Sequence, residues 1–365
     1  RLYAPAVHSL AALAFVSWMI AGAGWHQSLV IAIAVLIITC PCAMGLAVPA
    51  AQVVASGALI RKGLLVKDGS ALERLAEVDA VVFDKTGTLT LGELRADVAG
   101  LDGEQQAIAL ALAQVSRHPV SIGLARTLSE RGVQPAEIID IVEDSGRGVS
   151  GSFAGRNVAL EKPRQASGKT AVDLRIDGAA TSIGFADRMR VDAGAAVRRL
   201  QSLGLSATIL SGDAELAVKD VASELGIPGR GGIDPAGKLA ALDAMNAEGQ
   251  RPLMVGDGLN DGPALAAAHA SIAPGTASDA SQQAADAVFI GERLMPVALA
   301  VQVARRTMAI VRQNFGFAIG YNVLAVPLAL AGLVTPLVAA IAMSLSSLVV
   351  VGNSLRLARS AEDGA

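Results

Sequence analysis

The sequence is poor in aromatic side chains and in charge. Phe, Trp and Tyr make up 3% of its 365 residues, and Asp, Glu, Lys and Arg together make up 17%. So few aromatic residues leave no stacking platform for nucleic-acid bases. A net charge of -3 also leaves no basic face for a phosphate backbone. We therefore expect no nucleic-acid partner.

Cysteine is almost absent, and the two cysteines present are separated by one residue. Cys40 and Cys42 flank Pro41. Cysteines this close in sequence rarely form a structural disulfide, because the bridge is strained. The pair is therefore expected to take part in metal or redox chemistry.

Long apolar stretches are abundant, since 52% of the residues are hydrophobic. A bilayer is crossed by roughly 20 apolar helical residues, and we predict four such spans, at 4–23, 28–50, 313–332 and 334–353. They pair into two membrane hairpins, with lipid as a partner. Because the chain starts at Arg1 and no signal peptide precedes the first span, we expect a fragment of a longer protein.

Basic residues flank the predicted spans on one side. They are Arg61, Lys62 and Lys67 after the second span, Arg305, Arg306 and Arg312 before the third, and Arg356 and Arg359 after the fourth. By the positive-inside rule these ends are cytoplasmic. The predicted location is a bacterial inner (plasma) membrane, with 59–305 in the cytoplasm.

The segment between the hairpins alternates apolar runs with Ala- and Leu-rich stretches. The runs 80–83, 207–210, 252–255 and 287–290 predict strands of a parallel sheet with crossover helices. Residues 95–189 contain more glycine and shorter strand-like pieces, which indicates an inserted α+β domain. The expected division is a membrane hairpin at 1–58, a discontinuous α/β domain at 59–94 and 190–305, the insertion at 95–189, a second hairpin at 306–358, and a tail at 359–365.

Residues 84–90 are the most informative stretch. Asp84 follows an apolar strand, where an open α/β sheet places its ligands. A carboxylate there is a reasonable nucleophile for phosphoryl transfer, because an acyl phosphate is reactive. Gly87 lets the backbone turn sharply towards phosphate oxygens.

Polar residues also follow the later strands. Ser211-Gly212-Asp213 offers a hydroxyl and an amide to a phosphoryl oxygen, and Lys238 offers a positive charge. In the run 256–261, Asp257 can share Mg²⁺ with Asp84. A single Asp after a strand is usually a helix cap or turn residue. The joint occurrence of these groups in this order instead predicts phosphoryl transfer.

Cys40-Pro41-Cys42 lies inside the second predicted span. Proline bends a membrane helix and frees backbone groups there. Two thiolates beside that bend suit Cu(I) and other soft ions. The alternative is that both cysteines are small buried hydrophobes, but their position around one proline favours metal binding.

The run Asp84-Lys85-Thr86-Gly87-Thr88 resembles the phosphorylation signature of P-type ATPases in the haloacid dehalogenase superfamily, and 256–261 resembles their hinge motif. The resemblance implies a haloacid dehalogenase-like phosphorylation domain with an inserted nucleotide-binding domain. It also implies ATP as substrate, phosphorylation of Asp84, and Mg²⁺ held by Asp84, the Thr86 carbonyl and Asp257. The remaining residues of the implied site are Ser211, Lys238, Asn260 and Asp261.

Two motifs of the insertion resemble the nucleotide site of heavy-metal ATPases. One contains His118-Pro119, and the other runs from Glu143 through Gly146 to Gly148. The resemblance implies that these residues receive adenine, with Gly212 and Asp213 as further nucleotide contacts. Arg117 stands where the family commonly has Glu.

Polar residues in the last two spans resemble those of Cu(I)-transporting class IB ATPases. They are Tyr321-Asn322 and the run from Met343 to Ser347. The resemblance implies Cu(I) ligation by Cys40, Cys42, Tyr321, Asn322, Met343 and Ser347. The sequence after Cys42 further resembles the subfamily serving cytochrome oxidase assembly, which implies a copper chaperone or acceptor protein as a possible partner.

The family's actuator domain with Thr-Gly-Glu, and the membrane helices before it, do not occur in this sequence. The chain is therefore not expected to complete a transport cycle alone. Three alternatives stay open: a zinc or cadmium pump, a membrane-anchored phosphatase, and a non-catalytic metal-binding protein. Phosphatases of this superfamily usually have an acid/base Asp where this chain has Thr86, which argues for a long-lived phosphoenzyme.

Overall fold

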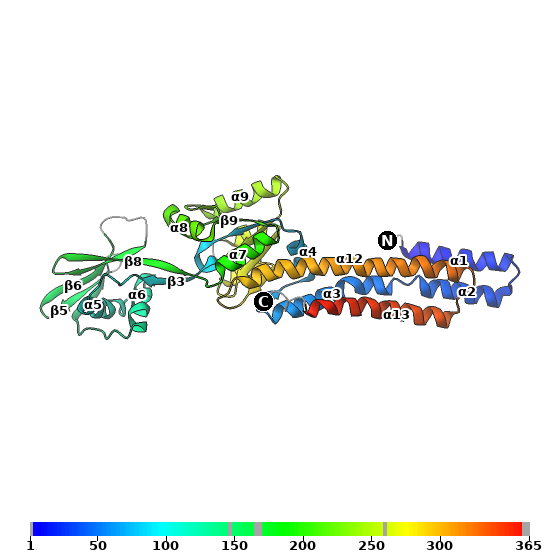
Figure 1. Cartoon of the computed structure of the whole chain (residues 1–365), viewed down its shortest axis with the longest axis horizontal. Helices are drawn as coiled ribbons and strands as arrows, with labels where there is room; N and C mark the ends of the chain where they lie inside the picture. The colour runs from blue at the N-terminus through cyan, green and yellow to red at the C-terminus, as the bar shows by residue number, and fades with distance from the viewer. Residues whose placement is uncertain (1–2, 145–147, 164–169, 258–260, 360–365) are drawn as a thin grey trace. The chain divides into compact units, whose positions relative to one another are not determined.

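The computed structural model describes residues 3–144, 148–163, 170–257 and 261–359, which form two compact units. The first unit combines Arg1–Glu77 with Leu299–Ala365, and the second is Val78–Ala298. Figure 1 labels the elements of both. Each unit has hydrophobic clusters of its own and is described separately below.

The first unit is mainly helical. Its elements are α1 (Tyr3–Ile20), α2 (Gly24–Ile38), α3 (Cys42–Ile60), β1 (Leu64–Val66), α4 (Gly69–Glu77), most of α12 (Met295–Leu330), α13 (Pro336–Ser354) and a short 3-10 helix (Leu355–Arg359). Along α3, buried alanines recur at every fourth residue, at 43, 47, 51 and 55. Ala43 and Ala47 pack with Ala318 and Val350, because small side chains let helices approach closely.

The chain breaks between α2 and α3, where the sequence predicted a bend. Pro41 has no backbone N–H to donate, and Cys40 N donates to Ile37 O at 3.2 Å in a tightened last turn. The Thr39 hydroxyl donates to Val35 O at 2.6 Å, which satisfies a carbonyl at the end of α2. The two cysteines therefore lie on either side of an irregular segment.

The prediction of four membrane-crossing helices is wrong, because not all four are both long enough and apolar enough to cross a bilayer. Among the described residues, two helical segments pass, Gly24–Ile60 and Pro336–Ala358, and Pro5–Ile20 is a shorter apolar helix. The first segment joins α2 and α3 across their break. Helix α12 does not pass, because Arg305, Arg306 and Arg312 occupy its first half and further polar residues lie in its second half.

The second unit contains a parallel sheet. Its strands are β2 (Ala80–Phe83), β9 (Ser206–Leu210), β10 (Gly229–Arg230), β11 (Pro252–Val255), β12 (Ala270–Pro274) and β13 (Ala287–Phe289). The four predicted strands are present, and β10 and β12 are additional. Between the strands run α7 (Ala193–Ser202), α8 (Glu215–Leu225), α9 (Pro235–Ala247), α10 (Gly262–Ala267) and α11 (Asp279–Ala284).

The strand order of this sheet reverses at β2. The order is β13-β12-β11-β2-β9-β10, and each neighbouring pair is parallel. Phe83, the last residue of β2, is level with Val255 of β11 and Ile209 of β9. Ligands of open α/β sheets bind at such a reversal, outside the carboxyl ends of the strands. Residues that follow β2, β9 and β11 therefore meet at one edge.

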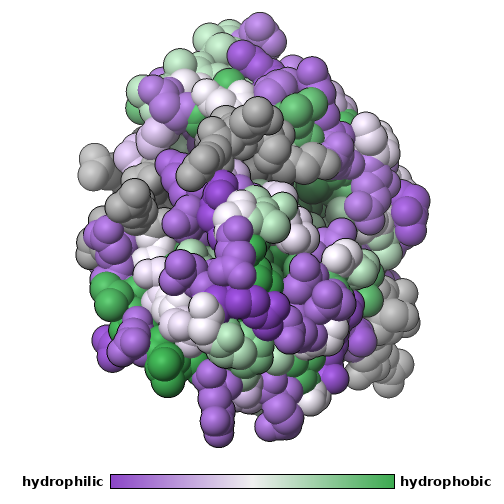
Figure 2. Space-filling view, turned by 90° about the vertical axis from the view of Figure 1, so that its left-hand side faces the viewer, coloured by the Kyte–Doolittle hydropathy of each residue, from purple (hydrophilic) through white to green (hydrophobic). Residues whose placement is uncertain are grey.

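A second sheet is inserted after β2. It is antiparallel, in the order β3-β8-β7-β6-β5-β4. The strands are β3 (Thr90–Ala96), β4 (Ile139–Asp144), β5 (Gly148–Phe153), β6 (Arg156–Glu161), β7 (Ala171–Ile176) and β8 (Ala179–Met189). Helices α5 (Gly103–Ala113) and α6 (Pro119–Glu130) share a buried cluster with its inward-facing residues, such as Val149, Leu160 and Leu174. Hydrophilic residues predominate on the face shown in Figure 2, where β5, β6 and α5 point at the viewer.

Candidate active site

Asp84 lies directly after the fully buried strand β2. Its backbone N–H donates to Val255 O of the neighbouring β11 at 2.8 Å, which holds the residue at the sheet edge. Only 6% of Asp84 is exposed. The carboxylate is therefore fixed in a nearly dry position at the strand-order reversal.

Lys238 joins two buried carboxylates. Its Nζ lies 2.6 Å from Asp84 Oδ1 and 2.8 Å from Asp261 Oδ1. Asp234 begins α9 by accepting from Gly237 N at 2.7 Å, and this cap places Lys238 in the first turn, facing inward. Burial alone would lower the pKa of Lys238, but the two carboxylates raise it above its usual value. Lys238 is thus a permanent positive charge beside Asp84.

Three carboxylates surround this single lysine. Oxygens of Asp84, Asp257 and Asp261 lie within 4.8 Å of one another. Burial, the dominant cause, raises the pKa of Asp84 to about 7 and that of Asp257 to about 6. Asp261 Oδ2 is buried without a hydrogen-bond partner in the described part of the chain. The excess negative charge and the free oxygen fit a divalent cation with oxygen ligands, such as Mg²⁺.

Gly87 is required by the approach of Asp257. Its φ is +70°, and a Cβ placed on it would lie 1.5 Å from Asp257 Oδ2. A side chain here would collide with a proposed metal ligand and strain the backbone. The glycine expected to make a sharp turn therefore also makes room for the second carboxylate.

Asp213 contacts the loop after Asp84. Its Oδ2 accepts from the Thr86 hydroxyl at 2.8 Å and lies 2.6 Å from Lys85 Nζ. Burial would raise the pKa of Asp213, but the hydrogen bonds from Lys85 and Thr86 outweigh it, so that pKa is lowered. Ser211 is buried, and its Oγ accepts from Asp213 N at 3.2 Å. Lys85 was not predicted as a site residue, although its place directly after Asp84 was a usable signal.

The nucleotide residues predicted from the two motifs of the insertion lie in the inserted domain, whereas Gly212 and Asp213, also predicted to contact the nucleotide, follow β9 of the parallel sheet. His118 is exposed and caps α6, its Nδ1 accepting from Val120 N at 3.3 Å, and Pro119 is the first residue of that helix. Glu143 lies on the exposed strand β4, opposite Val149. Gly148 begins β5, where a Cβ would lie 2.0 Å from Leu160 O. Two predicted residues, Gly146 and Asn260, lie outside the described residues.

A polar groove on the inserted sheet was not foreseen. Its volume is about 480 Å³, within the range of small-molecule sites. It is lined mainly by β5 and β6, with Arg175 and Glu161 forming an ion pair at 3.2 Å. His118, Glu143 and Gly148 are not in its lining. Its residues form no motif, so no sequence pattern predicted it.

A small cavity in the first unit collects most of the predicted ion ligands. Its volume is about 10 Å³, close to that of one water molecule. The lining includes Cys40, Tyr321, Asn322, Met343 and, in place of the predicted Ser347, Ser346. Tyr321 Oη and Asn322 Oδ1 are buried and have no hydrogen-bond partner among the described residues. Unpaired oxygens beside a sulfur suit a bound ion.

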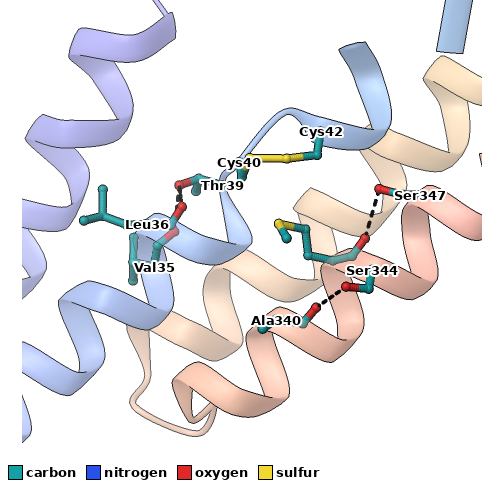
Figure 3. Close-up of a disulfide and its surroundings, with 9 residues drawn as sticks. Val35, Leu36, Thr39, Cys40, Cys42, Ala340, Ser344 and Ser347 are labelled. Carbon is teal, nitrogen blue, oxygen red and sulfur yellow. Dashed lines mark hydrogen bonds between the residues drawn. A yellow bond between two sulfur atoms is a disulfide. The ribbon is translucent and has the colours of Figure 1, made fainter. Parts of the chain in front are cut away.

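The two cysteines are joined by a disulfide, which corrects the expectation that they stay apart (Figure 3). The reason is the helix break: in a continuous helix, the side chains of residues two apart point to different sides, whereas the irregular segment between α2 and α3 lets both sulfurs turn to one side. Ser347 instead donates to Met343 O at 3.3 Å within α13 (Figure 3). Both sulfurs can ligate a metal only after reduction.

Comparison with known proteins agrees with this geometry. Residues 78–269, more than half of the chain, match the family model of haloacid dehalogenase-like hydrolases. The nitrogen fixation protein FixI of Rhizobium leguminosarum bv. viciae is 48% identical in an alignment 370 positions long that covers 98% of this chain and 48% of FixI. A copper-exporting P-type ATPase of Mycobacterium tuberculosis is 39% identical in an alignment 381 positions long that covers 98% of this chain and 50% of that protein. The chain thus spans about half the length of the curated relatives it matches.

Solved structures show the same relationship. A zinc-transporting PIB-type ATPase in its E2.Pi state superposes with a TM-score of 0.85 at 31% identity, covering 98% of this chain and 63% of that one. The catalytic domain of the CPx-ATPase CopB-B gives a TM-score of 0.57 at 28% identity and covers 67% of this chain. The chain therefore belongs to the haloacid dehalogenase-like hydrolases, and within them it is similar to heavy-metal P-type ATPases.

Proposed function

We propose that this chain carries the phosphorylation site and ion path of a pump that moves Cu(I) out of the cytoplasm through a phosphorylated Asp84. The observation that carries the proposal is the buried cluster of Asp84, Lys238 and Asp261 at the strand-order reversal. A fixed nucleophile beside a fixed positive charge is what in-line phosphoryl transfer needs.

The chemistry follows from the groups around Asp84. A carboxylate oxygen of Asp84 forms a bond to the γ-phosphorus of ATP, while the bond from that phosphorus to the β–γ bridging oxygen breaks and ADP leaves. Lys238 neutralises charge on the transferring group. Ser211 offers a hydroxyl to its oxygens, while the Thr86 hydroxyl donates to Asp213 and so helps to hold the loop after Asp84. The inserted domain, through His118 and Gly148, binds the nucleotide.

Mg²⁺ fits the same cluster. Asp84, Asp257 and the Thr86 carbonyl would hold it, and Asp261 is close enough to orient them. When bound, the ion would neutralise charge on the phosphate oxygens. It would also require Asp84 and Asp257 to be ionised, which opposes the effect of their burial.

The transported ion is proposed from the cavity chemistry. Cys40 and Met343 supply soft sulfur to the cavity, and a reduced Cys42 lies beside it. Soft sulfur ligands favour Cu(I) over zinc. One relative is named for copper export and one solved structure for zinc transport. Zinc is therefore the alternative ion.

The cellular setting is part of the proposal. Relatives of this chain are membrane ATPases, and two segments here are long and apolar enough to cross a bilayer. The basic ends Arg61 and Lys62, together with Arg356, support a cytoplasmic position for 59–305 in a multi-pass protein of the bacterial inner membrane. A copper chaperone or an acceptor protein would exchange the ion on either side.

Phosphoenzyme formation tests the proposal. A protein in which this chain is completed by the missing portion of a relative is incubated with radiolabelled ATP and Mg²⁺, and acid-stable label is counted. Cu(I), Ag(I), Zn(II) and no metal are compared, with Asp84→Asn and Cys42→Ser as controls. We expect label that requires Asp84 and Cys42 and is stimulated by Cu(I) or Ag(I).

The other outcomes separate the alternatives. Equal stimulation by Zn(II) would show that the ion assignment is wrong and leave the pump intact. If the amount of label does not depend on the metal and is unchanged in Cys42→Ser, transport would be rejected and a membrane-anchored phosphatase-like enzyme favoured. No label at all in the unaltered protein would reject phosphorylation of Asp84.

A further inference from the structure

The strand that returns from the inserted domain is attached to the loop that carries Asp84. Strand β8 ends at Met189, and the next residue, Arg190, is 3% exposed. Its guanidinium donates from Nε to Thr88 O at 2.6 Å, from Nη2 to Gly87 O at 2.8 Å and from Nη1 to Gly291 O at 3.0 Å. One buried cation thus holds two consecutive carbonyls of the phosphorylation loop.

The position of Arg190 is fixed from other sides as well. Its backbone N–H donates to Leu89 O at 2.9 Å. The guanidinium carbon lies 5.0 Å from the centre of the Phe289 ring, a cation–π distance. The guanidinium serves the three carbonyls from three separate nitrogens in a planar fork, whereas a lysine would have to serve them from a single nitrogen.

A second attachment lies at the end of the same loop. The Thr90 hydroxyl donates to Asp187 Oδ2 at 2.5 Å, and Thr90 Oγ1 accepts from Gly87 N at 3.2 Å. Both backbone polar groups of Gly87 are therefore held, one by Arg190 and one through Thr90. Gly87 is also the residue that Asp257 approaches.

We propose that Arg190, assisted by Asp187 through Thr90, is a positioning residue for phosphoryl transfer: it holds residues 84–90 in the conformation in which Asp84 and Thr86 face the incoming phosphate. The proposal rests on the proposed function of Asp84. Arg190 acts through the loop backbone, because its three side-chain hydrogen bonds all go to carbonyls. Because Arg190 follows β8 directly, a displacement of the nucleotide-binding insertion would also move residues 84–90.

Asp192 offers a matched control two residues further on. Its carboxylate accepts from Leu294 N at 2.8 Å and from Met295 N at 3.0 Å, which caps the start of α12. Replacing it removes stabilising hydrogen bonds near Arg190 without touching residues 84–90. If Arg190 had a purely structural role, replacing it would have the same effects as replacing Asp192.

The test compares Arg190→Lys with Asp192→Ala in the completed protein. We expect Arg190→Lys to lower the maximal rate of phosphoenzyme formation by about tenfold to a hundredfold, the cost of a small misplacement of reacting groups. The ATP concentration for half-maximal rate should change by less than about twofold. Hydrogen–deuterium exchange of 84–90 should accelerate. Asp192→Ala should lower the unfolding temperature and leave rate and exchange near the unaltered values.

Each result decides the proposal. Unchanged rate and exchange in Arg190→Lys, or an equal rate loss in Asp192→Ala, would overturn it. If Arg190→Lys does not fold, Thr90→Val is compared with Thr90→Ser, and only the variant without the hydroxyl should be slow. If the unaltered protein forms no phosphoenzyme, the proposed function fails and the positioning role fails with it, whereas faster exchange in Arg190→Lys would still show that Arg190 orders the loop.

Discussion

At the scale of single residues, the approach of Asp257 to Gly87 imposes the sharpest steric limit on the site. We expect Gly87→Ala to lower the rate of phosphoenzyme formation by about a hundredfold or more, because a Cβ would lie 1.5 Å from Asp257 Oδ2. Gly92→Ala is the matched control: its φ of +69° is equally strained, but its nearest neighbour is 3.7 Å away. Equal activity losses in the two variants would attribute the effect to backbone strain alone.

The buried carboxylates predict a linkage between pH and Mg²⁺. The pKa values of Asp84, about 7, and Asp257, about 6, exceed the ordinary 3.8 in the metal-free protein. Between about pH 4 and pH 7 the folded state therefore retains protons that the unfolded chain has lost, so stability falls as pH rises. Mg²⁺ binds the ionised carboxylates and should restore stability mainly at the upper end of this window.

Thermal unfolding of the chain in detergent measures this linkage. We expect Mg²⁺ to raise the unfolding temperature by about 2–4 °C at pH 8, the shift that roughly 1 kcal/mol produces in a domain of this size. The rise should be much smaller at pH 5 and absent in Asp257→Asn. An equal rise at both pH values would show that Mg²⁺ does not bind these carboxylates.

At the scale of secondary-structure elements, the break between α2 and α3 determines the direction in which the side chains of Cys40 and Cys42 point. We expect Pro41→Ala to let the helix continue and to turn the two sulfurs apart. Binding of Ag(I) by the reduced chain, measured by equilibrium dialysis, should weaken by about tenfold or more. Pro49→Ala, inside α3, is the control and should retain binding. Tight binding by Pro41→Ala would mean that the break is not needed for the site.

Secondary-structure elements and site residues could be predicted where a short sequence pattern determines a position in the fold. Strands β2, β9 and β11 are short apolar runs, and parallel strands bring their carboxyl ends together, so Asp84 and Asp257 could be placed from the sequence. The family resemblance pointed to Ser347, four residues after Met343, whereas Ser346 lines the cavity. Helical spacing alone does not fix which face of α13 meets its neighbours.

Other parts had no local signal. Arg190 acts on carbonyls about 100 residues earlier in the chain, and no short motif reports such a contact. The disulfide depends on the exact path of the chain through Pro41. The number of spans was overestimated because the second half of α12 mixes polar residues with its apolar ones and because the first apolar helix, Pro5–Ile20, is short.

At the scale of the whole molecule, the basic flanks predict a sidedness that can be measured. In a Cys40→Ser/Cys42→Ser background, we expect a membrane-impermeant maleimide to label His26→Cys in intact cells, because His26 is exposed at the end of a candidate span remote from Arg61 and Lys62. Thr335→Cys, at the start of the other span, should behave alike. Glu224→Cys, exposed on α8, should react only after permeabilisation. The reverse pattern would contradict a cytoplasmic 59–305.

The pairing of β3 with β8 makes the inserted domain, in topological terms, one long hairpin loop. The chain leaves along β3 and returns along β8, and Asp97 N still donates to Gly184 O at 2.8 Å where the two strands begin to part. A short turn joining these positions would therefore leave the parallel sheet and its connections intact. The catalytic sheet and the nucleotide-binding insertion are separable modules, and one could be exchanged or remodelled without redesigning the other.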